Sequence, residues 1–193
     1  MDGIFMSRFV VRPGETDFDV QDRIQGNLDL PMTAQGEMQI AEIAKALQSE
    51  ALDCIYASPS EPAYSAAEKL ARELGVPLKV LDRLGNVNLG LWQGLCRSEI
   101  RHKQPRLFRQ WEEEPESVCA PQGETCDEAL ERVRRALRKV VRKTSSFAVV
   151  ASEPLATLVI SVLKGEKPRL CGPAKMTNQR SRVECLETAD SVT

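Results

Sequence analysis

Short apolar runs alternate along this chain with longer segments in which apolar residues recur every three or four positions. The short runs predict five strands, over residues 8–11, 53–57, 78–81, 147–151 and 182–186. The periodic segments predict helices over 33–47, 63–74, 98–111, 123–143 and 154–163, the third of them broken at Pro105. Thr33 is placed to cap the first helix, and Gly75 to end the second. Strands interleaved with helices predict an α/β fold, a three-layer α/β/α sandwich with a mostly parallel central sheet.

Length and composition fit an ordinary globular protein. We find no internal repeat and no long linker in the 193 residues, so we expect one domain over 1–193. The 26 basic and 28 acidic residues nearly cancel, and we expect no nucleic-acid partner. The longest apolar run, 155–163, is far shorter than the ~20 residues of a membrane span, and the N-terminus does not resemble a signal peptide. We therefore expect a cytoplasmic protein without a membrane partner.

The six cysteines are scattered and form no CxxC pair, and the chain has one histidine. The usual zinc spacings are therefore absent, and we predict neither a metal site nor a cofactor. Cys54 lies in an apolar run and is expected to be buried. A disulfide framework is not expected, although a link between Cys119 and Cys126 stays open.

Residues 11–47 (VRPGETDFDVQDRIQGNLDLPMTAQGEMQIAEIAKAL) carry a specific resemblance. They resemble the opening of the histidine phosphatase superfamily, the phosphoglycerate mutase-like proteins, whose pattern is R-H-G-E-T, G-R-x-Q-G, D-x-P-L-T and G-x-x-Q-A. The matching residues, in order, are Arg12, Gly14, Glu15, Thr16, Arg23, Gln25, Gly26, Asp29, Pro31, Thr33, Gly36 and Gln39. Segments 56–68, 84–95, 123–124 and 147–155 resemble later motifs of the family. The resemblance implies a phosphoglycerate mutase-like fold.

The resemblance also implies where catalytic groups should lie. In the family, one histidine attacks phosphorus, a second histidine and two arginines hold the phosphoryl oxygens, and a carboxylate protonates the leaving oxygen. Position by position, the nucleophile falls on Pro13, the second arginine on Pro62, the acid on Asn86 and the second histidine on Ser152; only Arg12 is kept. Proline has no side-chain heteroatom and cannot attack phosphorus.

We therefore predict a degenerate member with no catalytic residues, a pseudoenzyme rather than an enzyme. His102, the one histidine, lies in a polar stretch and is expected to be solvated. The expected role is a binding or regulatory module that engages a protein partner or a small polar ligand. Its vestigial phosphate pocket would comprise Arg12, Pro13, Gly14, Glu15, Arg23, Pro62, Asn86 and Ser152.

Two alternatives stay open for the function. One is a phosphatase- or mutase-family enzyme with rewired chemistry, using Ser152 with Glu153 or a cysteine such as Cys54. The other is a structural subunit of a homo- or hetero-oligomer. At the pocket, Arg12 either keeps weak anion binding or pairs with Glu15 or another neighbour.

Two basic segments are candidates for contact with partners. The arginines and lysines of 131–143 favour a solvated helix face, because acidic residues are available for pairing and no aromatic residues are interleaved. The polar segment 169–182 lacks a clear period, and a partner-binding segment is most expected there.

Overall fold

The strands at the centre of the molecule are apolar on both faces, so helices cover both sides of the sheet. The computed structural model describes residues 7–176 and 182–187. In these ranges the strands are β1 (Ser7–Val11), β2 (Cys54–Ala57), β3 (Leu78–Val80), β4 (Phe147–Val150) and β5 (Val183–Glu187). The α-helices are α1 (Asp17–Val20), α2 (Ala34–Leu47), α3 (Ala63–Leu74), α4 (Arg97–Lys103), α5 (Pro105–Glu113), α6 (Cys126–Lys143) and α7 (Leu155–Lys164). Short 3-10 helices are η1 (Asp82–Leu84), η2 (Gly90–Trp92), η3 (Pro115–Ser117) and η4 (Pro173–Lys175).

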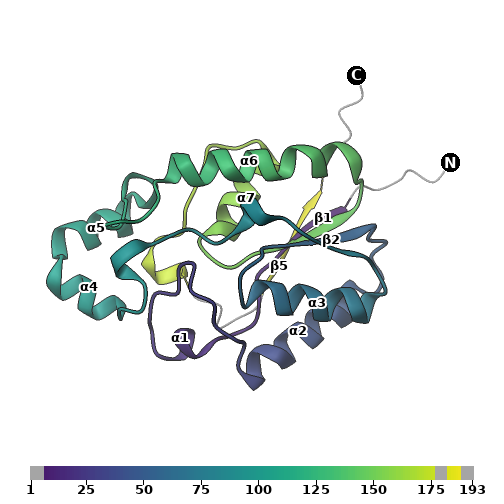
Figure 1. The fold of residues 1–193 in the computed structure, drawn as a ribbon, viewed down its shortest axis with the longest axis horizontal. Coiled ribbons are helices and arrows are strands. Elements are labelled where there is room, and N and C mark those ends of the chain that lie inside the picture. The colour runs from purple at the N-terminus through teal and green to yellow at the C-terminus, as the bar shows by residue number, and fades with distance from the viewer. Residues whose placement is uncertain (1–6, 177–181, 188–193) are drawn as a thin grey trace.

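The sheet has the strand order β3-β2-β4-β1-β5. The first four strands are parallel, with Val10 beside Val149 and Tyr56 beside the same residue on the other side. The last strand, β5, pairs antiparallel with β1. Parallel strands need crossover helices, and the intervening α2, α3, α6 and α7 supply them (Figure 1).

Alternate residues of each strand enter different apolar clusters, one on each face of the sheet. On one face, Val10, Tyr56 and Val149 pack in a cluster with α6 and α7. On the other, Val11, Ile55 and Val150 pack in a cluster with α2 and α3. Figure 1 shows α6 and α7 on one side of the strands and α2 and α3 on the other. The predicted three-layer α/β sandwich with a mostly parallel sheet is confirmed.

Local capping explains where the predicted and observed elements differ. The longest helix begins at Cys126 rather than at 123, because Thr125 is its N-cap and its hydroxyl accepts the Glu128 N–H. The predicted break of the segment 98–111 at Pro105 is confirmed: the segment forms two helices, α4 and α5, with Pro105 at the first position of the second. The short α1 was not predicted; Thr16 and Asp19 form a capping box around it. Within the described ranges, no helix is long and apolar enough to cross a membrane.

Candidate functional site

Loops that follow the parallel strands meet at one edge of the sheet, where α/β proteins place their ligands. The loop after β1 is pressed against the start of α2. A side chain at Gly14 would bring its Cβ within 2.2 Å of the Gly36 carbonyl oxygen, so both positions depend on the absence of a side chain. This close approach fixes the path of the chain directly after Arg12.

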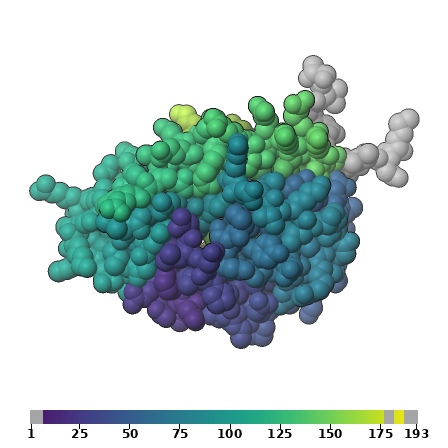
Figure 2. Space-filling model, in the orientation of Figure 1, coloured from purple at the N-terminus to yellow at the C-terminus, as the bar shows by residue number. Residues whose placement is uncertain are grey.

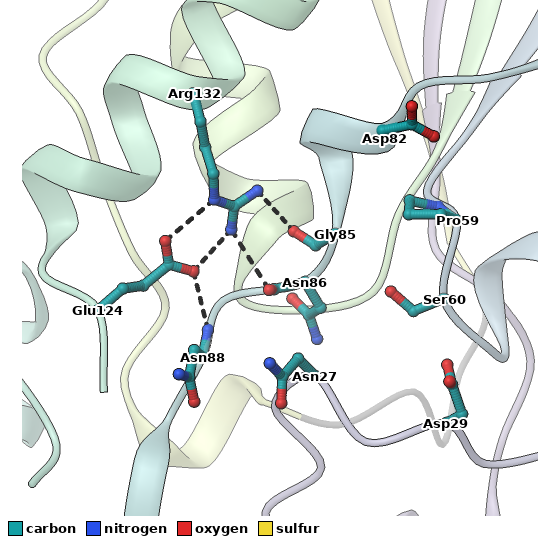
Figure 3. A pocket seen from close by; sticks show the side chains of 10 residues that line it. All are labelled: Asn27, Asp29, Pro59, Ser60, Asp82, Gly85, Asn86, Asn88, Glu124 and Arg132. Atoms are coloured by element: carbon teal, nitrogen blue, oxygen red, sulfur yellow. Dashed lines mark hydrogen bonds and ion pairs between the residues drawn. The ribbon is translucent and has the colours of Figure 1, made fainter. Parts of the chain in front are cut away.

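A pocket of about 520 Å³ opens at this edge. It is lined by Asn27, Asp29, Pro59, Ser60, Asp82, Gly85, Asn86, Asn88, Glu124 and Arg132 (Figure 3). These residues come from four separate stretches of chain, and Figure 2 shows purple, blue, teal and green segments meeting around a hollow. The lining is polar, with two exposed carboxylates, Asp29 and Asp82, at its rim. We take this pocket as the candidate site.

Arg132 and Glu124 form one wall of the pocket. The guanidinium of Arg132 donates to both carboxylate oxygens of Glu124, at 2.6 and 3.0 Å. It also donates to the carbonyls of Arg83 at 2.8 Å, Gly85 at 2.7 Å and Asn86 at 3.3 Å. These contacts use all five N–H donors of an arginine. Arg132 therefore holds the 83–86 loop in place and has no donor left for an anionic ligand.

Asn86, where the resemblance puts the catalytic acid, is a buried cross-link between loops. Its Nδ2 donates to the Gly26 carbonyl at 2.7 Å and to the Glu153 carbonyl at 2.9 Å. Its Oδ1 accepts from the backbone N–H groups of Val87 at 2.9 Å and Leu155 at 3.3 Å. The amide is thus satisfied on both sides, and a carboxylate could not make the two donated bonds.

Arg12 directly follows β1, is largely buried at the carboxyl end of the strands, and forms an ion pair with Glu153. Its Nε is 2.5 Å from the Glu153 Oε1, and the two side chains are only 11% and 5% exposed. The Oε2 of a second acid, Glu184, is 3.9 Å from the Arg12 Nη1. Of the two alternatives for Arg12, the structure shows the pairing with a neighbour, and that neighbour is Glu153 rather than Glu15. The Glu15 carboxylate instead accepts from the Thr33 hydroxyl at 3.0 Å.

The remaining predicted pocket residues serve the framework. Pro13 and Pro62 are buried, and Pro62 precedes the first residue of α3. Arg23 donates to the Gly94 carbonyl at 2.6 Å and so ties two loops together. Ser152 is 3% exposed, and its Oγ has no hydrogen-bond partner within the described ranges. The structure thus brings Arg12 and Asn86 together around the segment 152–155, while Glu15 and Arg23 are engaged elsewhere.

Sequence reasoning missed Asn27, Asn88 and Arg132 as pocket residues, and Glu153 as the partner of Arg12. Glu153 had one usable signal, since an acidic residue directly after a buried strand stands at a ligand-binding edge. Arg132 had none, because it is one of many basic residues on α6. Arg132 differs from the other basic residues of α6 in its ion pair with Glu124, which lies just before the start of the helix.

Side chains that could replace a histidine nucleophile are few. Burial raises the pKa of the Cys54 thiol, and burial together with the nearby Glu153 carboxylate raises that of Cys171 well above its ordinary value. Both thiols therefore stay protonated and unreactive near neutral pH. All six cysteines are free, His102 is exposed, and no cluster of metal-ligating residues occurs within 7–176 and 182–187.

Comparison with known proteins adds a family and named enzymes. A model of the histidine phosphatase superfamily (branch 1) matches residues 9–185. Phosphoserine phosphatase 1 of Hydrogenobacter thermophilus is 32% identical over 141 residues, which cover 73% of this chain and 67% of that protein. Glucosyl-3-phosphoglycerate phosphatase of Mycobacterium tuberculosis is 33% identical over 114 residues, which cover 59% of this chain and 50% of that protein. A solved structure of the mycobacterial glucosyl-3-phosphoglycerate phosphatase matches with a TM-score of 0.76 at 26% identity, covering 84% of this chain and 81% of that one.

These relatives overturn the prediction that the chain is not an enzyme. They are named phosphatases, and they point to an enzyme. The prediction gave most weight to the lost histidine route, whereas the relatives favour the alternative of a family enzyme with rewired chemistry. Pro13 does exclude a covalent intermediate at that position, but attack on phosphorus by another nucleophile, water included, does not need that side chain.

Proposed function

This chain belongs to the histidine phosphatase superfamily, and from that membership we propose that it is an enzyme acting on phosphate monoesters of small polar molecules by rewired chemistry. The observation that carries the proposal is the polar pocket at the carboxyl edge of the sheet, in a chain whose relatives are named phosphatases. The reaction class is hydrolysis: water attacks phosphorus, the P–O bond to the alcohol breaks, and the proton that the base takes from water is returned to the leaving alcohol oxygen.

The route follows from what the pocket offers. Position 13 is a proline, and burial raises the pKa of the Cys54 and Cys171 thiols, so we assign the attack to water rather than to a side chain. Asp29 and Asp82, both exposed at the pocket, are the groups that can accept the proton of that water. The amides of Asn27 and Asn88 and the hydroxyl of Ser60 can donate hydrogen bonds to phosphate or hydroxyl oxygens of a substrate (Figure 3).

A second candidate is recognition of a polar ligand at the same pocket, as a binding or regulatory function. One observation favours it: Glu153 engages Arg12, the one arginine that matches a phosphate ligand of the family. The pocket itself presents the carboxylates of Asp29 and Asp82 at its rim, and these suit a neutral or amine-bearing group better than a free phosphate dianion.

A steady-state assay separates the two candidates. Purified protein is incubated with phosphoserine, 3-phosphoglycerate and glucosyl-3-phosphoglycerate, and released phosphate is measured for the native chain and for Asp29→Asn and Asp82→Asn. Asp17→Asn is the matched control, because Asp17 is exposed on α1 and outside the pocket lining. Loss of a general base typically lowers turnover by about 10²–10⁴-fold.

Turnover that falls in one of the two pocket variants and stays in the control supports the enzymatic route. Turnover that survives in both pocket variants overturns the assigned base. Saturable binding of a substrate without any release of phosphate supports the second candidate. A quench-flow search for phosphorylated protein adds a direct check, since the water route leaves no phosphoenzyme.

A further inference from the structure

The carboxylate of Glu153 is surrounded by hydrogen-bond donors from three parts of the chain. Arg12 donates through Nε at 2.5 Å. The hydroxyl of Thr157 lies 2.8 and 3.0 Å from the two carboxylate oxygens, and its backbone N–H donates at 3.2 Å. The thiol of Cys171 is a further donor at 3.4 Å. With Glu153 only 7% exposed, these contacts take the place of water around the charge.

This set of donors has the composition of an oxyanion-binding site. A guanidinium supplies a permanent cation with directed N–H groups, and a hydroxyl adds a neutral donor. Thr157 is in the first turn of α7, so its backbone N–H also brings the positive end of the helix dipole. A cavity of about 720 Å³ adjoins the group and is lined in part by Arg12, Glu153, Thr157 and Cys171.

Arg12 already has carboxylates of the chain itself as its neighbours. Arg12 faces Glu153 and, more distantly, Glu184, and Glu184 also pairs with Lys164 at 2.9 Å. An external dianion at the Nε side of Arg12 would lie against the Glu153 carboxylate, and the repulsion between the two charges favours binding in molecules from which that carboxylate has withdrawn.

We propose that Arg12, Thr157 and the first turn of α7 form an oxyanion receptor whose resident ligand is the carboxylate of Glu153. Glu153 then decides whether an oxyanion such as phosphate binds there. The affinity for an external anion is lowered by the small fraction of molecules in which Glu153 has left the receptor. This inference goes beyond the proposed function and does not depend on turnover.

Binding of inorganic phosphate to Glu153→Ala tests the receptor directly. Isothermal titration at constant ionic strength is expected to give one site at least about tenfold tighter than in the native chain. The matched control is Glu184→Ala, which removes the other carboxylate near Arg12. Each variant loses one negative charge, so an effect of net charge alone would raise the affinity for phosphate equally in both. If the Glu153 carboxylate occupies the receptor, its removal raises the affinity for phosphate only in Glu153→Ala.

Stability gives a second readout, because Glu153→Ala leaves Arg12 buried without its main partner. The variant is expected to melt at a lower temperature than the native chain, and phosphate is expected to raise its Tm more than chloride of equal ionic strength does. If Glu153→Ala does not fold, Glu153→Asp keeps a carboxylate but shortens its reach, and phosphate should then bind tighter than to the native chain.

The double variant Arg12→Gln with Glu153→Ala removes the cation as well as its internal ligand. It is expected to lose the phosphate site, and with it the rise in Tm. The proposal is overturned if Glu153→Ala binds phosphate no tighter than Glu184→Ala. It is also overturned if the double variant binds as tightly as Glu153→Ala, because the anion would then lie away from Arg12.

Discussion

The change Asn86→Asp is the sharpest test of the site's internal framework, because it alters one atom type and almost no volume. Asn86 donates to the carbonyls of Gly26 and Glu153 and accepts from the N–H groups of Val87 and Leu155. An aspartate keeps both accepted bonds. It loses both donated bonds and turns a carboxylate toward two carbonyl oxygens.

The magnitude follows from the burial of this group. Each lost hydrogen bond is worth about 1 kcal/mol net, and each buried carbonyl left without a donor costs about 1–3 kcal/mol. Asn86 is only 6% exposed, so water does not easily replace the lost donor. We expect the free energy of unfolding at neutral pH to fall by about 3–5 kcal/mol, a large share of the ~5–15 kcal/mol typical of a folded protein. Lowering the pH should narrow the difference, because a protonated carboxyl can donate one of the lost bonds.

Urea denaturation followed by circular dichroism measures the effect, with Asn88→Asp as the matched control. Asn88 lines the same pocket and is half-buried, and its Oδ1 accepts from the Gly90 N–H at 2.9 Å. An aspartate keeps this bond, so we expect a loss of less than about 1 kcal/mol. Equal losses for the two variants would refute the assignment of Asn86 as the cross-link between these loops.

Three further predictions concern other parts of the molecule. Thr125→Ala removes the N-cap of α6, whose hydroxyl accepts the Glu128 N–H at 3.2 Å, and should lower the free energy of unfolding by about 1 kcal/mol in urea denaturation. Trp92→Ala removes a side chain that is only 2% exposed and leaves a void, so urea denaturation should show a free energy of unfolding lower by about 3–5 kcal/mol. An unchanged free energy of unfolding would contradict this prediction. Burial raises the pKa of Cys126 to about 11, so at pH 8 iodoacetamide should label exposed Cys119 first and Cys126 only after unfolding, as mass spectrometry of peptides would reveal.

The sequence determined the elements and the family because both depend on local pattern. Apolar runs of four or five residues predict strands wherever they occur, and Thr33 caps its helix through a contact three residues away. The ordered matches over 11–47 fix the register at position 13 in the same local way. The sequence therefore determined that no histidine follows the first strand.

The sequence alone did not determine what the absence of a histidine at position 13 means for activity. A missing histidine closes one route, but the remaining routes depend on which groups surround the pocket. Asp29, Asp82 and Asn88 line one pocket only because loops after different strands end at the same edge of the sheet. The spacing of these residues along the chain carries no trace of that neighbourhood.

The pairing of Arg12 with Glu153 was likewise decided by the tertiary structure. The two residues are 141 positions apart, and the sequence offered Glu15 as a nearer partner. They meet because β1 and β4 are adjacent and parallel, so that both chains leave the sheet at the same edge. Local pattern sets which segments become strands, but strand order is a property of the whole packed core, and strand order places the buried charges.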